Sequence, residues 1–159
     1  MSKKQNVERQ FVPAKLNRFL LVKLPSAYFT GIRIRQIDDH QTVVSVRHRW
    51  INQNPFRSLY FGVQAMAAEL STGVMVMRSI AKTGKRISML VTEQKGGFYK
   101  KATGKITFVC NQGHQIDEVI QRAIVTGEGQ KLTLTSSGTN TDGVEVSSFS
   151  FEWSIKVKP

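Results

Sequence analysis

The fold of this chain is decided by residues 59–80, LYFGVQAMAAELSTGVMVMRSI. Its apolar side chains recur at steps of three and four residues, which is the spacing of an α-helix. They are Val63, Met66, Ala67, Leu70, Val74 and Met77. Because apolar residues also fill most of the remaining sides, such a helix must be buried. We therefore expect one continuous helix over Leu59–Ile80, capped by Ser58 and enclosed by a sheet.

Within this stretch, Leu59–Met77 is the only apolar window of membrane-spanning length, but it carries Gln64, Glu69, Ser71 and Thr72. A charge at mid-bilayer costs roughly 2.5–3.5 kcal/mol, so a membrane span is disfavoured. We expect no membrane partner.

The segments around this helix alternate with period two or follow a helical stripe. The predicted strands are Ile32–Ile37, Thr42–Arg49, Arg86–Thr92, Thr103–Cys110, Lys131–Thr135 and a last strand through Val157. The predicted flanking helices are Ala14–Leu24 and His114–Ile124. Strands do not alternate regularly with helices, so the class is α+β, with a largely antiparallel sheet curling around the central helix.

The last strand is the clearest, because apolar residues from Phe149 to Val157 alternate with polar ones. Val144 and Val146 stand in the opposite phase. We expect one long strand over Val144–Val157, with a bulge near Ser147–Ser148 that resets the register.

Length and composition indicate a single globular domain over residues 1–159, with residues 1–12 as a flexible tail. The one cysteine, Cys110, has no partner for a disulfide within the chain, and the three histidines stand far apart. A metal site is therefore not expected. The N-terminus lacks the pattern of a signal peptide, which favours the cytoplasm.

The net charge of +12 is unevenly spread. Residues 77–105 hold eight Lys and Arg against one acidic residue, Glu93, so a polyanion is a plausible partner. Nucleic acid and a phosphorylated cofactor such as coenzyme A both fit this charge. The chain has no RNA-recognition signature and no Arg-rich helix, so no nucleic-acid partner is expected. The simpler interpretation of any single lysine is that it belongs to a solvated surface that keeps the protein soluble.

Phe61 and Gly62 lie in the first turn of the central helix, where backbone N–H groups lack internal partners. Such donors, aided by the helix dipole, stabilise a developing oxyanion. Glu69, seven residues after Gly62, lies on nearly the same face among Ala, Met and Leu. Burial raises the pKa of such a carboxyl and suits a general base or nucleophile.

Each of these residues also has a structural interpretation. Glu69 would serve equally as the partner of a buried Arg at a subunit interface, and Gly62 as a site of close packing. Asn54, before Pro55, is typical of a turn. Tyr60 could bind substrate through its hydroxyl or simply pack, and Thr72 could bind substrate or a neighbouring helix.

The order of elements and residues 52–69, NQNPFRSLYFGVQAMAAE, resemble the hot-dog fold acyl-CoA thioesterases. In particular, they resemble an uncharacterised bacterial branch, a domain of unknown function related to phenylacetate-pathway-type thioesterases. That branch has an Asn, a His-Phe-Gly that opens the central helix, and an Ala-Glu seven residues after the Gly. Tyr60 stands at the usual histidine position.

This resemblance implies that the protein hydrolyses the thioester of an acyl-CoA, with Glu69 as base or nucleophile and the Phe61 and Gly62 amides as the oxyanion site. It implies no cofactor beyond the coenzyme A of the substrate, and a homodimer or a tetramer. The expected substrate-binding residues are Asn54, Tyr60, Thr72, Lys82, Lys85 and Arg86. The alternative is a hot-dog module that binds an acyl thioester or another hydrophobic ligand without turnover, which Tyr60 favours.

Overall fold

The computed structural model describes residues 3–159. The helices are α1 (Lys3–Gln10), α2 (Pro13–Lys23), α3 (Pro25–Phe29), α4 (Phe61–Thr83) and α5 (Gly113–Thr126), with a 3-10 turn at Trp50–Asn52. The strands are β1 (Arg33–Ile37), β2 (Thr42–Arg47), β3 (Ile87–Phe98), β4 (Lys105–Cys110), β5 (Gln130–Thr139) and β6 (Glu145–Val157).

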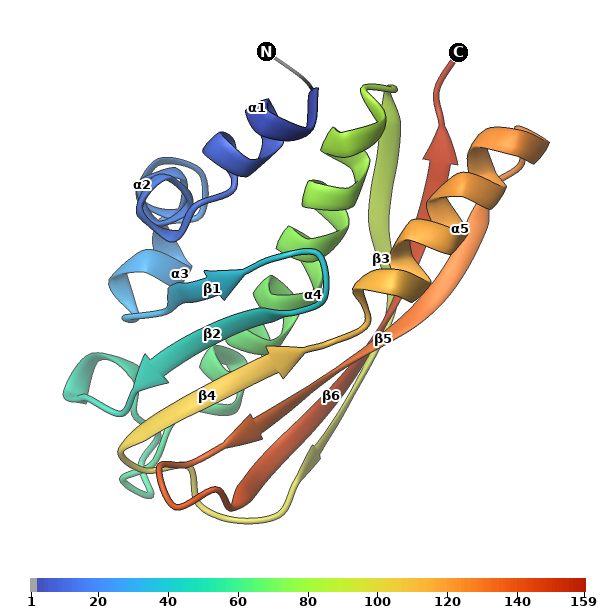
Figure 1. Ribbon diagram of the computed structural model, residues 1–159. Coiled ribbons are helices and arrows are strands. Elements are labelled where there is room, and N and C mark those ends of the chain that lie inside the picture. Colours follow the sequence, from blue (N-terminus) through green and yellow to red (C-terminus); the bar gives the residue numbers. More distant parts are fainter. Residues whose placement is uncertain (1–2) are drawn as a thin grey trace.

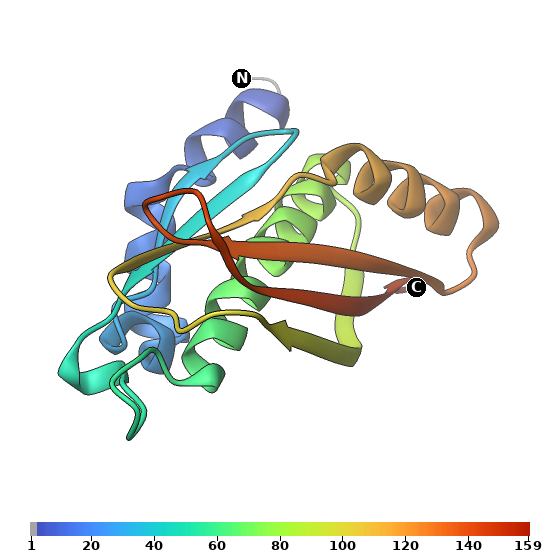
Figure 2. The ribbon, with the colours of Figure 1, turned by 90° about the horizontal axis from the view of Figure 1, so that it is seen from below.

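The six strands form one sheet in the order β1-β2-β4-β5-β6-β3, and every neighbouring pair is antiparallel. The sheet curves around α4, α1 to α3 lie beside α4 on the same face of the sheet, next to β1, and α5 flanks one end (Figure 1). The view from below shows the strands crossing beneath the long helix (Figure 2). This is the α+β arrangement expected from the sequence.

The helix α4 begins and ends slightly later than predicted. Tyr60 is its N-cap residue in an extended conformation, and no side chain caps the helix, so the predicted cap at Ser58 is wrong. Ser58 instead donates from its backbone amide and its hydroxyl to Asn54. The helix ends at Thr83, and the φ of +67° at its C-cap residue, Gly84, suits a residue without Cβ.

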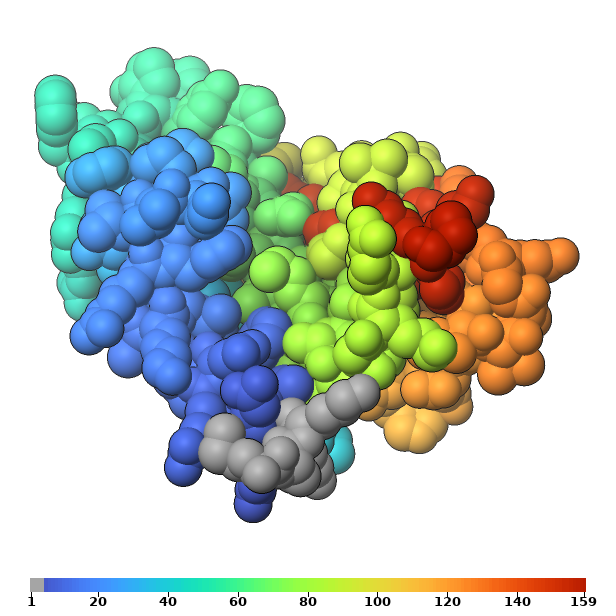
Figure 3. All heavy atoms as spheres, turned by 90° about the horizontal axis from the view of Figure 1, so that it is seen from above, coloured from blue at the N-terminus to red at the C-terminus, as the bar shows by residue number. Residues whose placement is uncertain are grey.

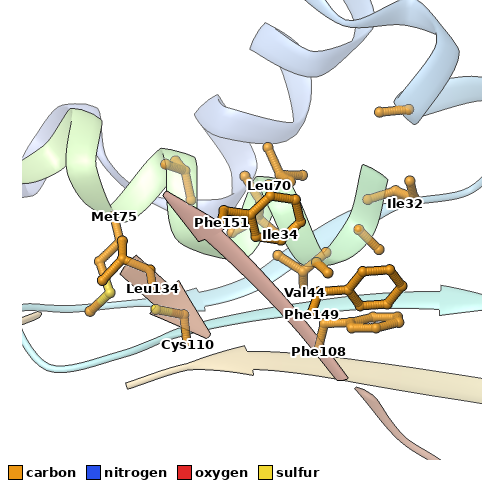
Figure 4. Packing of buried hydrophobic residues seen from close by; sticks show 14 of the residues in the cluster. Ile32, Ile34, Val44, Leu70, Met75, Phe108, Cys110, Leu134, Phe149 and Phe151 are labelled. Atoms are coloured by element: carbon orange, nitrogen blue, oxygen red, sulfur yellow. The ribbon is translucent and has the colours of Figure 1, made fainter. Parts of the chain in front are cut away.

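The core lies between α4 and the inner face of the sheet. Phe149, Phe151, Trp153 and Ile155 of β6 are all buried, as the alternation predicted. Figure 4 shows Met75 of α4 beside Leu134 and Cys110 of the sheet, Leu70 beside Phe151 and Ile34, and Phe108 and Phe149 further along. Polar positions of β6 therefore point to the outer face.

The bulge in β6 lies one to two residues earlier than expected. Strand β5 pairs regularly with β6 up to Gly138 opposite Ser147, and Thr139 then pairs with Glu145. Val146 and Ser147 are both buried although they are neighbours. The phase change therefore occurs at Val146, and the strand pairs regularly through Ser147–Ser148.

Strand β3 is twelve residues long, rather than ending near Thr92, and it forms one edge of the sheet. The regular alternation stops after Val91, and Thr92–Gly97 reads as a polar, glycine-containing segment. Pairing with β6 nevertheless continues to Phe98 opposite Ser147. Tertiary pairing thus extends the strand beyond its apolar pattern.

The N-terminal region is more ordered than a tail. Helix α1 contacts α4, and its Val7 is buried. Met1 and Ser2, also assigned to the expected tail, lie outside the described residues. Among the residues described, no helix is long and apolar enough to cross a membrane.

Candidate functional site

A groove of about 540 Å³ lies at the N-terminal end of α4. One wall is the loop before the helix, and the other is the end of β3 with the segment that follows it. The loop is fixed at both ends, because the Tyr60 amide donates to the Asn52 carbonyl and the Leu59 amide to the Ala102 carbonyl. Its lining includes Asn54, Tyr60, Phe61, Gln64, Lys100 and Lys101.

The two predicted oxyanion residues occupy the first two positions of α4. Within residues 3–159, the Phe61 and Gly62 amides have no backbone acceptor, because the hydrogen bonds to the Tyr60 carbonyl begin with Val63 and Gln64. Free donors at the positive end of a 23-residue helix are suited to hold an anionic oxygen.

Gly62 is also a site of close packing. A Cβ there would lie 3.0 Å from Cε1 of Tyr60, so the glycine leaves room for the tyrosine ring. The ring of Tyr60 stands 4.7 Å from that of Phe61, which in turn contacts Phe98 of β3 at 6.5 Å between centroids. These rings make one side of the groove apolar.

Asn54 lines the groove but uses its side chain within the turn. Its Oδ1 accepts hydrogen bonds from the Phe56 amide at 3.0 Å and from the amide and hydroxyl of Ser58, both at 3.2 Å. The turn interpretation of Asn54 therefore describes the structure, and the side chain shapes the loop that bears Tyr60.

Glu69 is a mostly buried carboxylate on α4 with no hydrogen-bond or ion-pair partner among the described residues. Burial raises its pKa above the ordinary value. Its Oε1 lies 3.1 Å from the position that a Cβ of Gly73 would take, beside Trp153. The carboxylate thus points along the helix away from Gly62.

The two halves of the expected site do not meet in one chain. Seven residues of helix rise about 10 Å, and the Glu69 carboxylate points further away. Glu69 does not line the groove that contains Phe61. Because a reacting carbon must lie about 3 Å from both the attacking group and the oxyanion donors, a single chain holds only separate parts of the site.

Thr72 lies fully buried, between Glu69 and the sheet. Its hydroxyl donates to the Glu69 carbonyl at 2.9 Å and accepts from Nε1 of Trp153 at 3.1 Å. In this chain both hydrogen bonds of the Thr72 hydroxyl are structural, and they join α4 to Trp153 of β6.

The three basic residues expected to bind substrate lie at the opposite end of α4, about 30 Å from the groove. Lys82 forms ion pairs with Asp39 at 2.7 Å and Asp117 at 3.4 Å, so its charge is already matched. Lys85 and Arg86 are exposed just after the helix. None of the three lines the groove.

Several groove residues were not predicted as ligands. Lys100 and Lys101 come from the same basic segment as Lys82 and are exposed, but only the folding back of β3 along α4 brings them beside Phe61. Gln64 is buried, donates to the Leu59 carbonyl and accepts from the Ser147 hydroxyl. The sequence feature that could have indicated its role is a polar amide side chain within an otherwise apolar helix.

One stripe of α4 remains partly uncovered. Gly62, Ala65, Met66 and Glu69, which follow helical spacing, are only half-buried. Figure 3 shows the green atoms of α4 at the surface, between the blue N-terminal helices and yellow-green β3. The stripe therefore runs from the oxyanion donors to the carboxylate along an open side of the molecule.

No group of three His, Cys, Asp or Glu side chains arranged to hold a metal occurs in the described part of the chain.

Comparison with known proteins gives a family and a fold. The family model described as "Domain of unknown function (DUF4442)" matches residues 14–155. No curated protein sequence matches the chain.

Solved structures share the architecture at low sequence identity. A Pseudomonas aeruginosa protein, PA5026, of unknown function and described as "Probable Thioesterase", is 18% identical with a TM-score of 0.76, over 92% of this chain and 97% of its own. OLEI01261 of Chlorobaculum tepidum, of unknown function, is 16% identical with a TM-score of 0.79, over 94% and 99%.

The thioesterase HI1161 of Haemophilus influenzae is 14% identical with a TM-score of 0.69, over 92% of each chain. These likenesses confirm the hot-dog fold.

Proposed function

This chain belongs to the DUF4442 family, whose domain has no assigned function, and we propose that it hydrolyses the thioester of an acyl-CoA. The proposal is supported by the geometry of the chain's own residues. The observation that carries the proposal is Glu69, a partly buried carboxylate with a raised pKa and no partner among the described residues. A structural carboxylate at such a position is normally paired. An unpaired one is suited to accept a proton from water or to attack a carbonyl.

The chemistry follows from these groups. Glu69 activates a water molecule or attacks the thioester carbon directly, the carbonyl oxygen becomes an oxyanion, and the Phe61 and Gly62 amides donate to it. When the oxyanion collapses, the C–S bond breaks, the acyl group leaves as a carboxylic acid, and coenzyme A leaves as a thiol with the proton that Glu69 took from water. Direct attack instead leaves an acyl anhydride on Glu69, which water then hydrolyses, and the thiolate takes its proton from solvent. Only ionised Glu69 acts as a base, so turnover should fall as the pH drops through the raised pKa of Glu69.

A homodimer completes the site. No element of the described part of the chain covers the half-buried stripe of α4 or the free edge of β3. If two copies of α4 pack antiparallel about a two-fold axis beside Met66, Glu69 of each subunit comes opposite Gly62 of the other. This packing brings the Glu69 carboxylate and the amides at the start of α4, which are far apart within one chain, into one site.

The groove at the start of α4 supplies the substrate contacts. Lys100 and Lys101 take the place first expected for Lys82, Lys85 and Arg86 as partners of the coenzyme A phosphates, because they line the groove. Phe61 and Phe98 offer apolar surface to the acyl group or the pantetheine arm.

The test is a hydrolysis screen over short, long and aromatic acyl-CoAs, with free thiol as the readout. On the best substrate, Glu69→Gln should lower turnover roughly 10²–10⁴-fold. Glu118→Gln, which removes an exposed carboxylate on α5, is the matched control and should leave turnover unchanged. Equal turnover in wild type and Glu69→Gln would remove Glu69 from the mechanism.

Binding without turnover is the second candidate function, and Tyr60 favours it. Its ring packs over Gly62, where a thioester carbonyl would approach. Calorimetric titration with a non-hydrolysable acyl-CoA analogue separates the two functions. Tight binding of the analogue, with no thiol released from any acyl-CoA in the screen, would establish the binding module.

A further inference from the structure

A second groove, of about 430 Å³, lies over β1, β2 and β4. Ile34, Val44 and Ile106 of these strands are buried in the core, so the residues between them point to the outer face of the sheet. The groove is lined by Gly31, Arg33, Arg35, Ser45, Arg47, Arg49 and Lys105. It shares no residue with the groove at the start of α4.

The lining of this groove, here called the arginine groove, holds five cationic side chains and no carboxylate. None of the five forms an ion pair with another residue in the range 3–159. Strand pairing forces them together, since Arg33 stands opposite Ser45 and Arg47 opposite Lys105. Mutual repulsion of unmatched like charges is unfavourable, and a bound anion would relieve it.

Two of the arginines are held in place by the protein. Nη1 of Arg33 donates to the Tyr28 and Ile32 carbonyls at 2.7 and 2.8 Å, and its guanidinium stacks 3.8 Å from the Tyr28 ring centroid. Nε of Arg35 donates to the buried Ser45 hydroxyl at 2.7 Å. Fixing the guanidinium planes reduces the entropy lost when a ligand binds.

We propose that the arginine groove binds a diphosphate group, either as the free anion or as part of a nucleotide. Planar guanidinium groups bind phosphate oxygens in pairs, and several arginines around one small groove match an anion with adjacent phosphates. The volume suits a small ligand. Single-stranded nucleic acid is disfavoured, because its binding sites use aromatic side chains for base stacking, and this lining has none.

The experiment measures binding of inorganic diphosphate and of ADP to the full-length protein by calorimetry at low ionic strength. The double variant Arg47→Gln/Arg49→Gln removes two exposed guanidinium groups from the groove. It should weaken binding of diphosphate at least about tenfold. Arg122→Gln/Lys158→Gln removes two exposed charges outside the groove and should bind like wild type.

Equal affinity for diphosphate and ADP would identify the diphosphate itself as the recognised group, and tighter binding of ADP would identify a nucleotide. A mixed-sequence oligonucleotide provides the third arm. The proposal is overturned if wild type binds neither diphosphate nor ADP, if both double variants weaken binding equally, or if only the oligonucleotide binds. Should the glutamine variant unfold, Arg47→Lys/Arg49→Lys keeps the charge and should still weaken binding several-fold by losing paired contacts.

Discussion

Glu69 is a partly buried carboxylate without a hydrogen-bond or ion-pair partner among the described residues. Its carboxylate lies next to Gly73 on the side of Trp153, and no described residue donates a hydrogen bond to it. The ionised form is therefore poorly solvated, which raises its pKa. Above that raised pKa the ionised side chain weakens the native state, whereas in the unfolded chain water solvates it fully.

Glu69→Gln should consequently stabilise the protein at neutral pH relative to wild type. The folded-state pKa is raised, so the penalty on the wild type is present at pH 7 and disappears as the pH falls below the ordinary value of 4.5. Urea denaturation of both proteins at pH 7 and pH 4 measures the difference. A variant less stable than wild type at pH 7 would indicate that Glu69 has a cationic partner in the assembled protein.

The sequence alone was enough to predict the surroundings of Glu69 but not those of Lys82. Apolar neighbours within one helix are visible in a linear pattern, whereas Asp39, the partner of Lys82, lies 43 residues away in a turn between strands. Thr72 is a similar case, because its partner Trp153 belongs to the last strand. Side-chain roles that depend on distant pairing need the fold.

At the scale of elements, one acidic residue ties the β1–β2 turn to α4. Asp39 accepts from Arg78, whose side chain is only 7% exposed, and from Lys82, which also reaches Asp117 of α5. Its pKa is lowered, chiefly by the hydrogen bond from Lys82 despite an opposing effect of burial. Three elements thus meet at this cluster.

Asp39→Asn should destabilise the protein by about 1–3 kcal/mol at pH 7, because it leaves the buried Arg78 without its counterion. This cost is smaller than that of breaking a fully buried ion pair, because the Asp39 side chain is 37% exposed. The folded-state pKa is lowered, so this stabilisation is present above the ordinary value of 3.8 and is lost as the pH falls below it.

Urea denaturation should therefore separate this variant from wild type at pH 7 more than at pH 3. Asp142→Asn, in the exposed β5–β6 turn, is the control. A variant at Asp39 as stable as Asp142→Asn at pH 7 would contradict the role of the cluster.

The start of α5 is fixed by a close approach of two backbones. A Cβ on Gly113 would clash with the Asp39 carbonyl oxygen. Gly113→Ala should therefore force the helix and the turn apart, at a cost of about 1–3 kcal/mol or more. Gly129→Ala, whose Cβ would meet only the Ile155 carbonyl at 4.0 Å, is the control. Thermal unfolding of both variants measures the effect, and equal melting temperatures would argue against it.

Element boundaries were predicted less well than element types. The α4 pattern was clear, yet the helix begins at Phe61 because the preceding residues bridge to Ala102 and Asn52. The length of β3 was missed because pairing with β6 needs backbone groups and tolerates its polar side chains. The periodicity of apolar residues identifies the buried face of a helix or strand. The residues at which the element begins and ends are decided by hydrogen bonds to segments that are distant in the sequence.

At the scale of the whole molecule, the free edge of the sheet and the exposed side of α4 lie next to each other. The sheet ends at the unpaired outer edge of β3, and next to it the α4 stripe from Gly62 to Glu69 is half-buried. Phe61 and Phe98 expose apolar rings at the same place. A free strand edge beside exposed apolar surface is a site for pairing with another chain.

We therefore expect a homodimer at micromolar concentration, with a mass near twice the 17.9 kDa of one chain. Met66→Glu should dissociate it, because the new charge would be buried between the two α4 helices without a partner. Val125→Glu makes the same kind of change on the exposed face of α5 and should remain dimeric. Light scattering measures all three proteins.

If the active site is shared between subunits, Met66→Glu should also lose turnover while keeping its helical signal. A wild type of monomer mass, or a monomeric Met66→Glu with full turnover, would contradict the shared site. In the second case the single chain itself must bring Glu69 to the oxyanion donors, which the direction of its carboxylate toward Gly73 opposes.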